Sequence, residues 1–160
     1  MRTSFCIPFA ASVFISLQLF AADAPPAPPD GTALEQKFIT TMTNAVFVGR
    51  WTVDGDDKPP KTERYTIISV KKIAGDLWLF NARIQFGGKD VTVPLPIPVK
   101  WAGDTPVISV TDMGIPGIGT YTARVLIYED RYAGTWNGAT HGGSLFGRIE
   151  HPPATQPAAK

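Results

Sequence analysis

Cysteine, histidine and unbalanced charge are nearly absent from this sequence of 160 residues. Its one cysteine, Cys6, lies in an apolar segment at the N-terminus, and only two histidines are present. The formal net charge is +1, with acidic and basic residues interspersed. Such a balance gives no field that would attract nucleic acid, so no nucleic-acid partner is expected. Because no cysteine follows Cys6, the rest of the chain is expected to fold by burial alone, without a disulfide.

Long hydrophobic runs are also lacking after the first 20 residues, and the early run has the features of a leader. Residues 1–24 carry Arg2, then an uncharged run over 5–20, and end in small residues, which is typical of a secretory signal peptide. The run is too short and too early to favour a permanent membrane span, so no stable span is expected after processing. We therefore predict an exported protein, periplasmic or secreted, cleaved between residues 21 and 25.

The rest of the chain divides into a spacer, one domain and a tail. Residues 25–31 include four prolines, which fix φ and remove hydrogen-bond donors, so an extended spacer is predicted. Residues 152–160 are rich in proline and alanine without periodicity and are expected to be disordered. Residues 32–151 are long enough for one domain with a buried core and too short for two domains of ordinary size.

One helix followed by eight strands is predicted within this domain. Apolar residues recur at helical spacing over residues 33–44, where we expect the helix, and Thr32 with Glu35 forms a capping-box pattern at its start. Alternating apolar and polar residues, separated by Gly, Pro and Asp signals, then predict short antiparallel strands. These strands are Val46–Asp54, Glu63–Lys71, Leu77–Phe86, Val91–Trp101, Pro106–Asp112, Thr120–Glu129, Arg131–Asn137 and Ser144–Glu150.

Two Gly-x-Trp patterns suggest how the sheet closes. Gly49 and Trp51 lie in the first predicted strand, and Gly134 and Trp136 lie in the seventh. A glycine within an aromatic strand leaves a notch where another backbone can approach closely. We therefore expect the first and last strands to meet. This predicts an all-β domain of about eight antiparallel strands that form a closed barrel, with a two-sheet β-sandwich as the alternative.

The fourth predicted strand carries prolines on one edge. Its apolar residues share one parity, while Pro94, Pro96 and Pro98 share the other. Because amide directions alternate along a strand, the three prolines remove donors from the same edge and leave the opposite edge intact. In a barrel, this predicts a weak or open ladder along that edge. In a sandwich, it predicts an edge strand that is protected against pairing with other molecules.

A helix, a Gly-x-Trp strand and a series of up-and-down strands resemble the lipocalin and wider calycin group of small ligand-binding barrels. The resemblance covers residues from about 32 to 150 and rests on the Gly-Arg-Trp motif at 49–51 and, more loosely, on the second Gly-x-Trp. It implies a lipocalin-like barrel with an arginine from a late strand laid over Trp51 at the closed end. Arg148 matches that arginine by position, with Arg131 as second choice. The proline-rich fourth strand departs from the lipocalin pattern, and the late glycine-rich strands also resemble small exported bacterial proteins of unknown role.

Four tryptophans are many for a domain of this size, and three of them fall on predicted inward faces. Inward tryptophans are more often core than binding site. The interior of an eight-stranded barrel is either filled by side chains or holds one small ligand, and the sequence leaves both open. The loop Met113–Gly119 is the candidate mouth. The residues expected to contact an apolar ligand are Trp78, Phe80, Ile84, Val93, Leu95, Tyr121 and Val125.

Catalytic and metal-binding motifs are lacking. The sequence contains neither Gly-x-Ser-x-Gly nor His-Glu-x-x-His, and we interpret His141 and His151 as solvated residues of a turn and the tail. Catalysis would require His141 within hydrogen-bond reach of a carboxylate such as Asp112. We therefore predict a non-catalytic protein without metal or cofactor. Two functions are open: binding of a small apolar molecule, or an envelope protein-interaction or structural module with a solid core.

Overall fold

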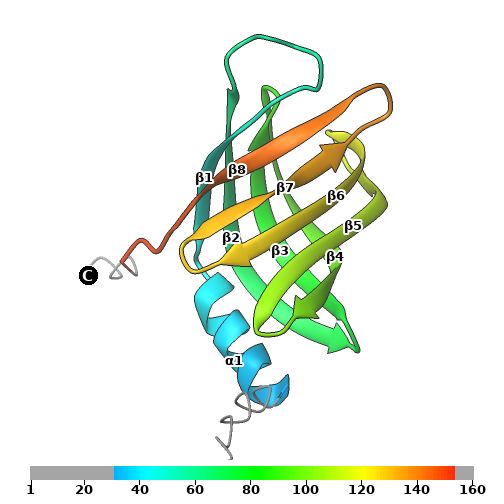
Figure 1. The fold of residues 1–160 in the computed structure, drawn as a ribbon. Coiled ribbons are helices and arrows are strands. Elements are labelled where there is room, and N and C mark those ends of the chain that lie inside the picture. The colour runs from blue at the N-terminus through cyan, green and yellow to red at the C-terminus, as the bar shows by residue number, and fades with distance from the viewer. Residues whose placement is uncertain (1–30, 154–160) are drawn as a thin grey trace, which may run out of the picture.

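The computed structural model describes residues 31–153, which form one helix followed by eight strands (Figure 1). The predicted signal peptide, the spacer as far as Asp30 and the tail from residue 154 lie outside the described residues. All eight predicted strands are present, with ends that differ from the prediction by three residues or fewer. The elements are α1 (Gly31–Met42), β1 (Val46–Trp51), β2 (Lys61–Ala74), β3 (Leu77–Phe86), β4 (Lys89–Ala102), β5 (Thr105–Ile115), β6 (Gly119–Tyr128), β7 (Arg131–Asn137) and β8 (Gly142–Glu150).

The eight strands form one closed antiparallel barrel in sequence order. Each strand pairs with the next, and β1 pairs with β8, from Val46 opposite Glu150 to Trp51 opposite Leu145. Figure 1 shows β8 running beside β1, so that the first and last strands complete the wall. The predicted meeting of these strands is confirmed. The sandwich alternative is wrong, because β1 and β8 pair with each other and leave no sheet edge between them.

The helix α1 covers one end of the barrel, which we call the helix end (Figure 1). Phe38 and Met42 lie one turn apart on the same face of α1, and both are buried. The ring of Phe38 meets Trp78 edge-on at a centroid distance of 5.1 Å and Trp101 at 5.7 Å. These contacts bury large aromatic surfaces between the helix and strands β3 and β4, so α1 closes this end of the barrel.

The limits of α1 differ slightly from the prediction. The helix starts at Gly31 and ends at Met42, two residues earlier at each end than the sequence pattern indicates. Asn44 follows with a φ of 61°, the left-handed conformation that commonly terminates helices. Thr32 lies inside the helix rather than before it, and the carboxylate of Glu35 pairs with Lys72 of β2. Glu35 therefore ties the helix to the barrel wall.

In two strands, β2 and β5, the alternation between inward-facing and outward-facing residues is interrupted by register shifts. In β5, Val110 faces the interior, and a register shift between Val110 and Met113 brings Met113 and Ile115 inward as well. Asp112 lies in this bulge with a φ of 45°, and its amide donates to Thr122 Oγ1 at 2.9 Å. Strand β2 contains two similar shifts. An extra residue at a bulge exchanges the two faces of a strand, which places more apolar side chains inside the barrel.

The ladder between β4 and β5 is short, as the proline pattern predicts. Only four residues of each strand pair, from Val99 opposite Ile108 to Ala102 opposite Thr105. Pro94, Pro96 and Pro98 precede this ladder, while the same part of β4 pairs along its whole length with β3. Prolines cannot donate to the missing bonds, which explains why pairing stops where they begin. Residues 89–98 of β4 and 109–115 of β5 do not pair with each other, although each segment pairs with its other neighbour. We call the gap between these two segments the seam.

The end of the barrel opposite α1 carries four strand connections, and we call it the loop end. The connection between β1 and β2 is the longest and rises above the barrel in Figure 1. At the β3–β4 connection, Gly87 and Gly88 both have positive φ values, which a two-residue hairpin turn requires and glycine adopts at no steric cost. Within residues 31–153, no helix is both long and apolar enough to cross a membrane.

Candidate functional site: an apolar cavity inside the barrel

The barrel contains an apolar cavity of about 170 Å³ between the helix end and the loop end. Twenty side chains line it, with at least one from every strand, and all of them are aliphatic, aromatic or methionine. Their polar atoms contribute almost nothing to the wall. The wall therefore offers hydrophobic and dispersion contacts and very little to hydrogen-bond a polar group of a ligand.

The volume limits what the cavity can hold. Pockets for drug-sized ligands usually measure about 300–1,000 Å³. An apolar cavity of about 150 Å³, lined by Leu, Ile and Phe, stays dry and binds benzene or xenon. At about 170 Å³, the cavity of this barrel belongs to the second class. A single ring or a short alkyl chain fits this space.

Most of the predicted contact residues line the cavity. Trp78 does not, because its ring packs against Phe38 of α1 and is only 1% exposed. Val93 is half-buried in the seam and also lies outside the lining. The other five line the cavity, since β3, β4 and β6 keep the alternation that their sequences show. These five are Phe80, Ile84, Leu95, Tyr121 and Val125.

Several lining residues were not predicted. Tyr65 and Ile67 come from β2, and Val110, Met113 and Ile115 come from β5. In β5 a register shift separates Val110 from Met113, so simple alternation from one end of the strand gives the wrong face at the other end. In β2, Tyr65 and Ile67 both precede the shifts and share one face by alternation. In β5 the signal is visible in the sequence, because the apolar residues change parity across the two polar residues 111 and 112.

The predicted mouth loop is shorter than expected. Most of residues 113–119 belongs to β5 and β6, which leaves a turn of Pro116, Gly117 and Ile118 at the loop end. Ile115 and Ile118 nevertheless fold inward and line the cavity. The turn thus brings two branched apolar side chains to the rim of the cavity.

Aromatic rings pack together at the loop end. Trp51 lies 4.7 Å from Phe86 and 5.4 Å from Trp136, measured between ring centroids. The indole of Trp136 donates its Nε1–H to the carbonyl of Thr52 at 3.1 Å, which fixes the ring across β7 and the end of β1. At Gly134, a Cβ atom would lie 1.9 Å from the carbonyl oxygen of Arg124, so only glycine allows β6 and β7 to approach as they do.

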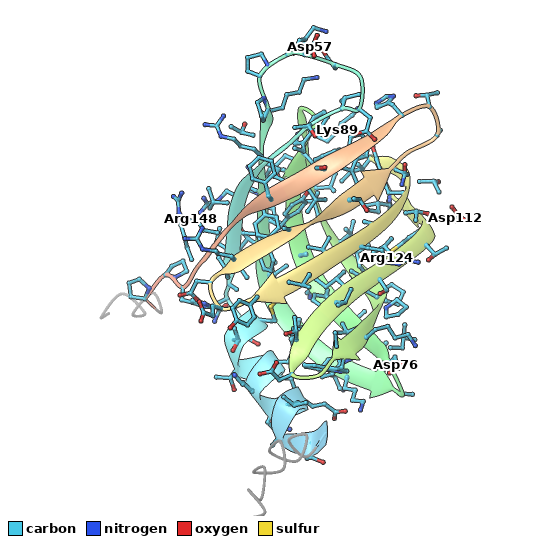
Figure 2. The ribbon with its side chains drawn as sticks, in the orientation of Figure 1. Asp57, Asp76, Lys89, Asp112, Arg124 and Arg148 are labelled. Atoms are coloured by element: carbon cyan, nitrogen blue, oxygen red, sulfur yellow. The ribbon has the colours of Figure 1, made fainter. Side chains whose placement is uncertain are left out.

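The arginine expected over Trp51 is not there. Arg148 points outward on the left of Figure 2, where its Nε and Nη2 pair with Glu150 at 3.0 and 2.7 Å. Its partner in β1 is Val48 rather than Trp51. Arg131, the second choice, lies directly opposite Arg148 on the same outer face. Strand parity explains the error, because the neighbours of Arg148 in β8 face inward and Arg148 therefore faces out.

A lysine occupies the position over the tryptophan instead. Lys61 Nζ lies 4.8 Å from the centroid of the Trp51 ring, within the range of a cation–π interaction. Lys61 stands opposite Trp51 in the β1–β2 ladder, so the contact is a direct cross-strand pair. Trp51 itself lies at the end of β1 away from α1, which also departs from the lipocalin arrangement that the sequence suggested.

Glu63 is the one charged residue in the core of the described chain, with 3% of its surface exposed. Tyr132 donates its hydroxyl hydrogen to Glu63 Oε1 at 2.8 Å, and Tyr65 donates to Oε2 at 2.9 Å. The rings of both tyrosines line the cavity. Glu63 lies opposite Gly49 in the β1–β2 ladder, and the missing side chain of Gly49 leaves room for the Tyr132 hydroxyl.

Burial controls the protonation of this group. Removal from water raises the pKa of Glu63 to about 7, and the two tyrosine hydrogen bonds, which favour the carboxylate, oppose that rise only in part. Burial also raises the pKa of Tyr65 and of Tyr132, with the nearby Glu63 carboxylate as a further cause. The tyrosines therefore stay protonated and serve as donors, while Glu63 changes charge near neutral pH.

The histidine and the carboxylate named as a catalytic pair lie in different hydrogen-bond systems. His141 contacts Thr140 Oγ1 through Nδ1 at 2.7 Å and meets the Trp136 ring edge-on. Asp112, at the right of Figure 2, accepts from Thr122 Oγ1 at 3.0 Å. In the part of the chain that the structure describes, no three His, Cys, Asp or Glu side chains gather as a metal site.

Comparisons with known proteins add no relative to this picture. No family model matches the chain, and neither a curated protein nor a solved structure is significantly similar to it. The closed eight-stranded antiparallel barrel is consistent with a lipocalin-like barrel at the level of architecture. Function must therefore be argued from the cavity and the surface of this chain.

Proposed function

We propose that this protein is a non-catalytic binding protein that holds one small apolar molecule inside its barrel. The observation that carries the proposal is the cavity of about 170 Å³ with its apolar wall. Burial of apolar surface stabilises a complex by about 25 cal/mol per Å², and a ligand among the twenty lining side chains buries most of its surface. A ligand of one ring or a short chain gains this energy without leaving a polar group unpaired.

The ligand class follows from what the wall lacks. A carboxylate, an ammonium or an amide placed in the cavity would lose its hydration and find almost no partner there, at a cost of several kcal/mol. Glu63 does not compensate, because both of its oxygens already accept from tyrosines. We therefore expect a neutral molecule such as an aromatic hydrocarbon or a volatile apolar compound.

The proposed place of action is outside the cytoplasm. Residues 1–24 have the layout of a secretory leader, and no cysteine follows residue 24, so the domain does not depend on the redox state of its compartment. An exported carrier or scavenger of small apolar compounds fits both features. The alternative, an envelope protein-interaction module, is favoured by a hollow on the outer face of the barrel that exposes large apolar side chains.

Native mass spectrometry on the protein isolated from the envelope of its own host tests the proposal. The expected result is a protein of higher mass than the bare chain that releases one neutral compound of constant mass on denaturation. A bare protein that also fails to take up benzene or toluene when these are added in excess would contradict it. Release of a lipid or another compound too large for the cavity would contradict it as well.

A further inference from the structure

A second hollow lies on the outer face of the barrel, across strands β6, β7, β8 and β1. The outward side chains of these strands align in two neighbouring rows. The first row consists of Leu126, Ala133, Phe146 and Arg50. The second row consists of Tyr128, Arg131, Arg148 and Val48. The hollow, which we call the arginine groove, is also lined by Gly49, Thr62, Tyr132 and Gly147.

The groove exposes large apolar side chains. Tyr128 is 58% exposed, and Leu126 and Phe146 are each 43% exposed. Three of the five large hydrophobic residues that are exposed in the described chain therefore gather in one place. Single exposed apolar residues are normal on a protein surface, but a contiguous group rimmed by charged residues is typical of a binding surface.

The charges of the groove are unbalanced. Arg131 stands directly opposite Arg148 in the β7–β8 ladder, and like charges in that position are destabilising. Glu150 neutralises Arg148, whereas Arg131 has no ion pair among residues 31–153. Arg50 reaches only a backbone carbonyl, that of Pro60 at 3.4 Å. Two guanidinium groups are thus available to an anion, and an arriving anion would relieve the repulsion across the ladder.

The shape of the groove favours an extended occupant. It has a volume of about 650 Å³, far larger than the internal cavity. Its floor is low because Ala133 and Val48 carry short side chains where the flanking residues carry long ones. The hollow crosses four strands, and neighbouring strands lie about 4.8 Å apart. A recessed trough of this kind receives an extended chain, whereas a flat bilayer surface would rest on protruding loops.

We propose that the arginine groove binds an extended acidic segment of a partner protein. Arg131 and Arg50 hold its carboxylates, since the planar guanidinium donates two parallel hydrogen bonds to a carboxylate. Apolar side chains of the segment lie against Leu126, Tyr128 and Phe146 over the floor at Ala133. The groove lies on the outside of the wall, so this function is independent of ligand binding in the cavity.

A labelled peptide of alternating aspartate and leucine is the probe, with binding to the full chain followed by fluorescence anisotropy. The double variant Arg50→Gln/Arg131→Gln is expected to lose at least about tenfold in affinity, because hydrogen bonds to charged groups are among the stronger ones. Binding by the unaltered protein is expected to weaken as salt rises to roughly 0.5 M, where surface charges are screened. A peptide of alternating lysine and leucine is expected not to bind.

Two further variants separate the groove from general effects. Ala133→Leu fills the floor and is expected to weaken binding without loss of charge, whereas Ala102→Leu, at an exposed position at the end of β4, is expected to leave it unchanged. Lys89→Gln, which removes an exposed positive charge near the β3–β4 turn, is the control for net charge (Figure 2). An unchanged near-ultraviolet circular dichroism spectrum of Ala133→Leu shows that the barrel is intact whether or not the peptide binds.

Three results would overturn the proposal. The first is equal affinity of the unaltered protein and the double arginine variant for the acidic peptide. The second is binding of vesicles rich in anionic lipid that depends on Arg50 and Arg131 while the peptide does not bind. The third is self-association in sedimentation velocity that the double variant abolishes, again without peptide binding, which would assign the groove to a second copy of the chain.

Discussion

Tyr132 donates a hydrogen bond to Glu63 across the inside of the barrel, at 2.8 Å from Oη to Oε1. The two residues lie 69 positions apart in the sequence, and Tyr132 also packs over Gly49 and Gly147, where β1 meets β8. Glu63 and Tyr132 therefore hold together the two strands that flank the closure of the barrel, and they do so directly beside the apolar cavity.

This pair makes stability depend on pH in a defined direction. Between the usual carboxyl pKa of 4.5 and the folded value of about 7, the unfolded chain has released a proton that the folded protein retains. Rising pH in this window therefore favours unfolding. We expect the free energy of unfolding to fall by roughly 2–3 kcal/mol from pH 5 to pH 8, because about two pKa units of this window lie above pH 5 and each unit corresponds to about 1.4 kcal/mol.

Chemical denaturation at several pH values measures this loss. Glu63→Gln, which cannot ionise, is expected to show a flat profile over the same window. The free energy of unfolding of Glu63→Gln, minus that of the unaltered protein, should therefore be larger at pH 8 than at pH 5. An unaltered protein whose stability rises from pH 5 to pH 8 would show that the carboxyl group is ionised throughout, contrary to this account.

Gly49 is predicted to be irreplaceable at the barrel closure. A Cβ atom there would lie 2.1 Å from Tyr132 Oη and 2.3 Å from the carbonyl oxygen of Phe146. Gly49→Ala is therefore expected to cost roughly 3 kcal/mol, because tyrosine or backbone must move. Gly114→Ala is the matched control, since its nearest neighbour would be 3.9 Å away, and its effect should stay within roughly 0.5 kcal/mol. Equal urea midpoints for the two variants would refute the predicted close packing.

Lys61, and not Arg148, is predicted to stabilise Trp51. Lys61→Gln removes the cation from the ring and should lower stability by about 0.5–1 kcal/mol. Arg148→Gln breaks a surface ion pair only, and its effect should stay within roughly 0.5 kcal/mol. Urea denaturation followed by tryptophan fluorescence reports both. A larger loss for Arg148→Gln than for Lys61→Gln would restore the arrangement that the lipocalin resemblance implied.

The seam is predicted to be the weakest part of the barrel wall. Alternate amides of residues 109–115 face β4, where the prolines leave no β4–β5 ladder. In hydrogen exchange, these amides should exchange at least about tenfold faster than amides of β7, which is paired on both sides. Uniform protection around the barrel would mean that the seam is bridged by other contacts.

Much of the fold could be predicted from the sequence, and the reason is visible in particular strands. In β3, alternation from Trp78 to Phe86 continues without a break, so both its limits and its inward face were correct. The three prolines of β4 also determined where pairing stops, because a missing amide acts locally and needs no knowledge of the neighbours.

The candidate site was predicted less completely, because it depends on register. Val110 and Met113 both face the cavity only because a bulge lies between them, and a bulge depends on partners in β6 such as Thr122. The sequence predicts Glu63 only as the first residue of a strand. Glu63 shares the inward parity of Tyr65 in the structure, and the opposing Gly49 and the distant Tyr132 are brought to it only by barrel closure.

The internal cavity is proposed to bind one small apolar molecule, and calorimetric titration with toluene tests this binding most directly. The unaltered protein is predicted to bind one toluene with a saturable signal. Ala123→Leu, which fills the cavity from β6, should abolish binding, and the exposed control Ala102→Leu should retain it. Undiminished binding by Ala123→Leu, or no binding by the unaltered protein, would contradict the proposed function.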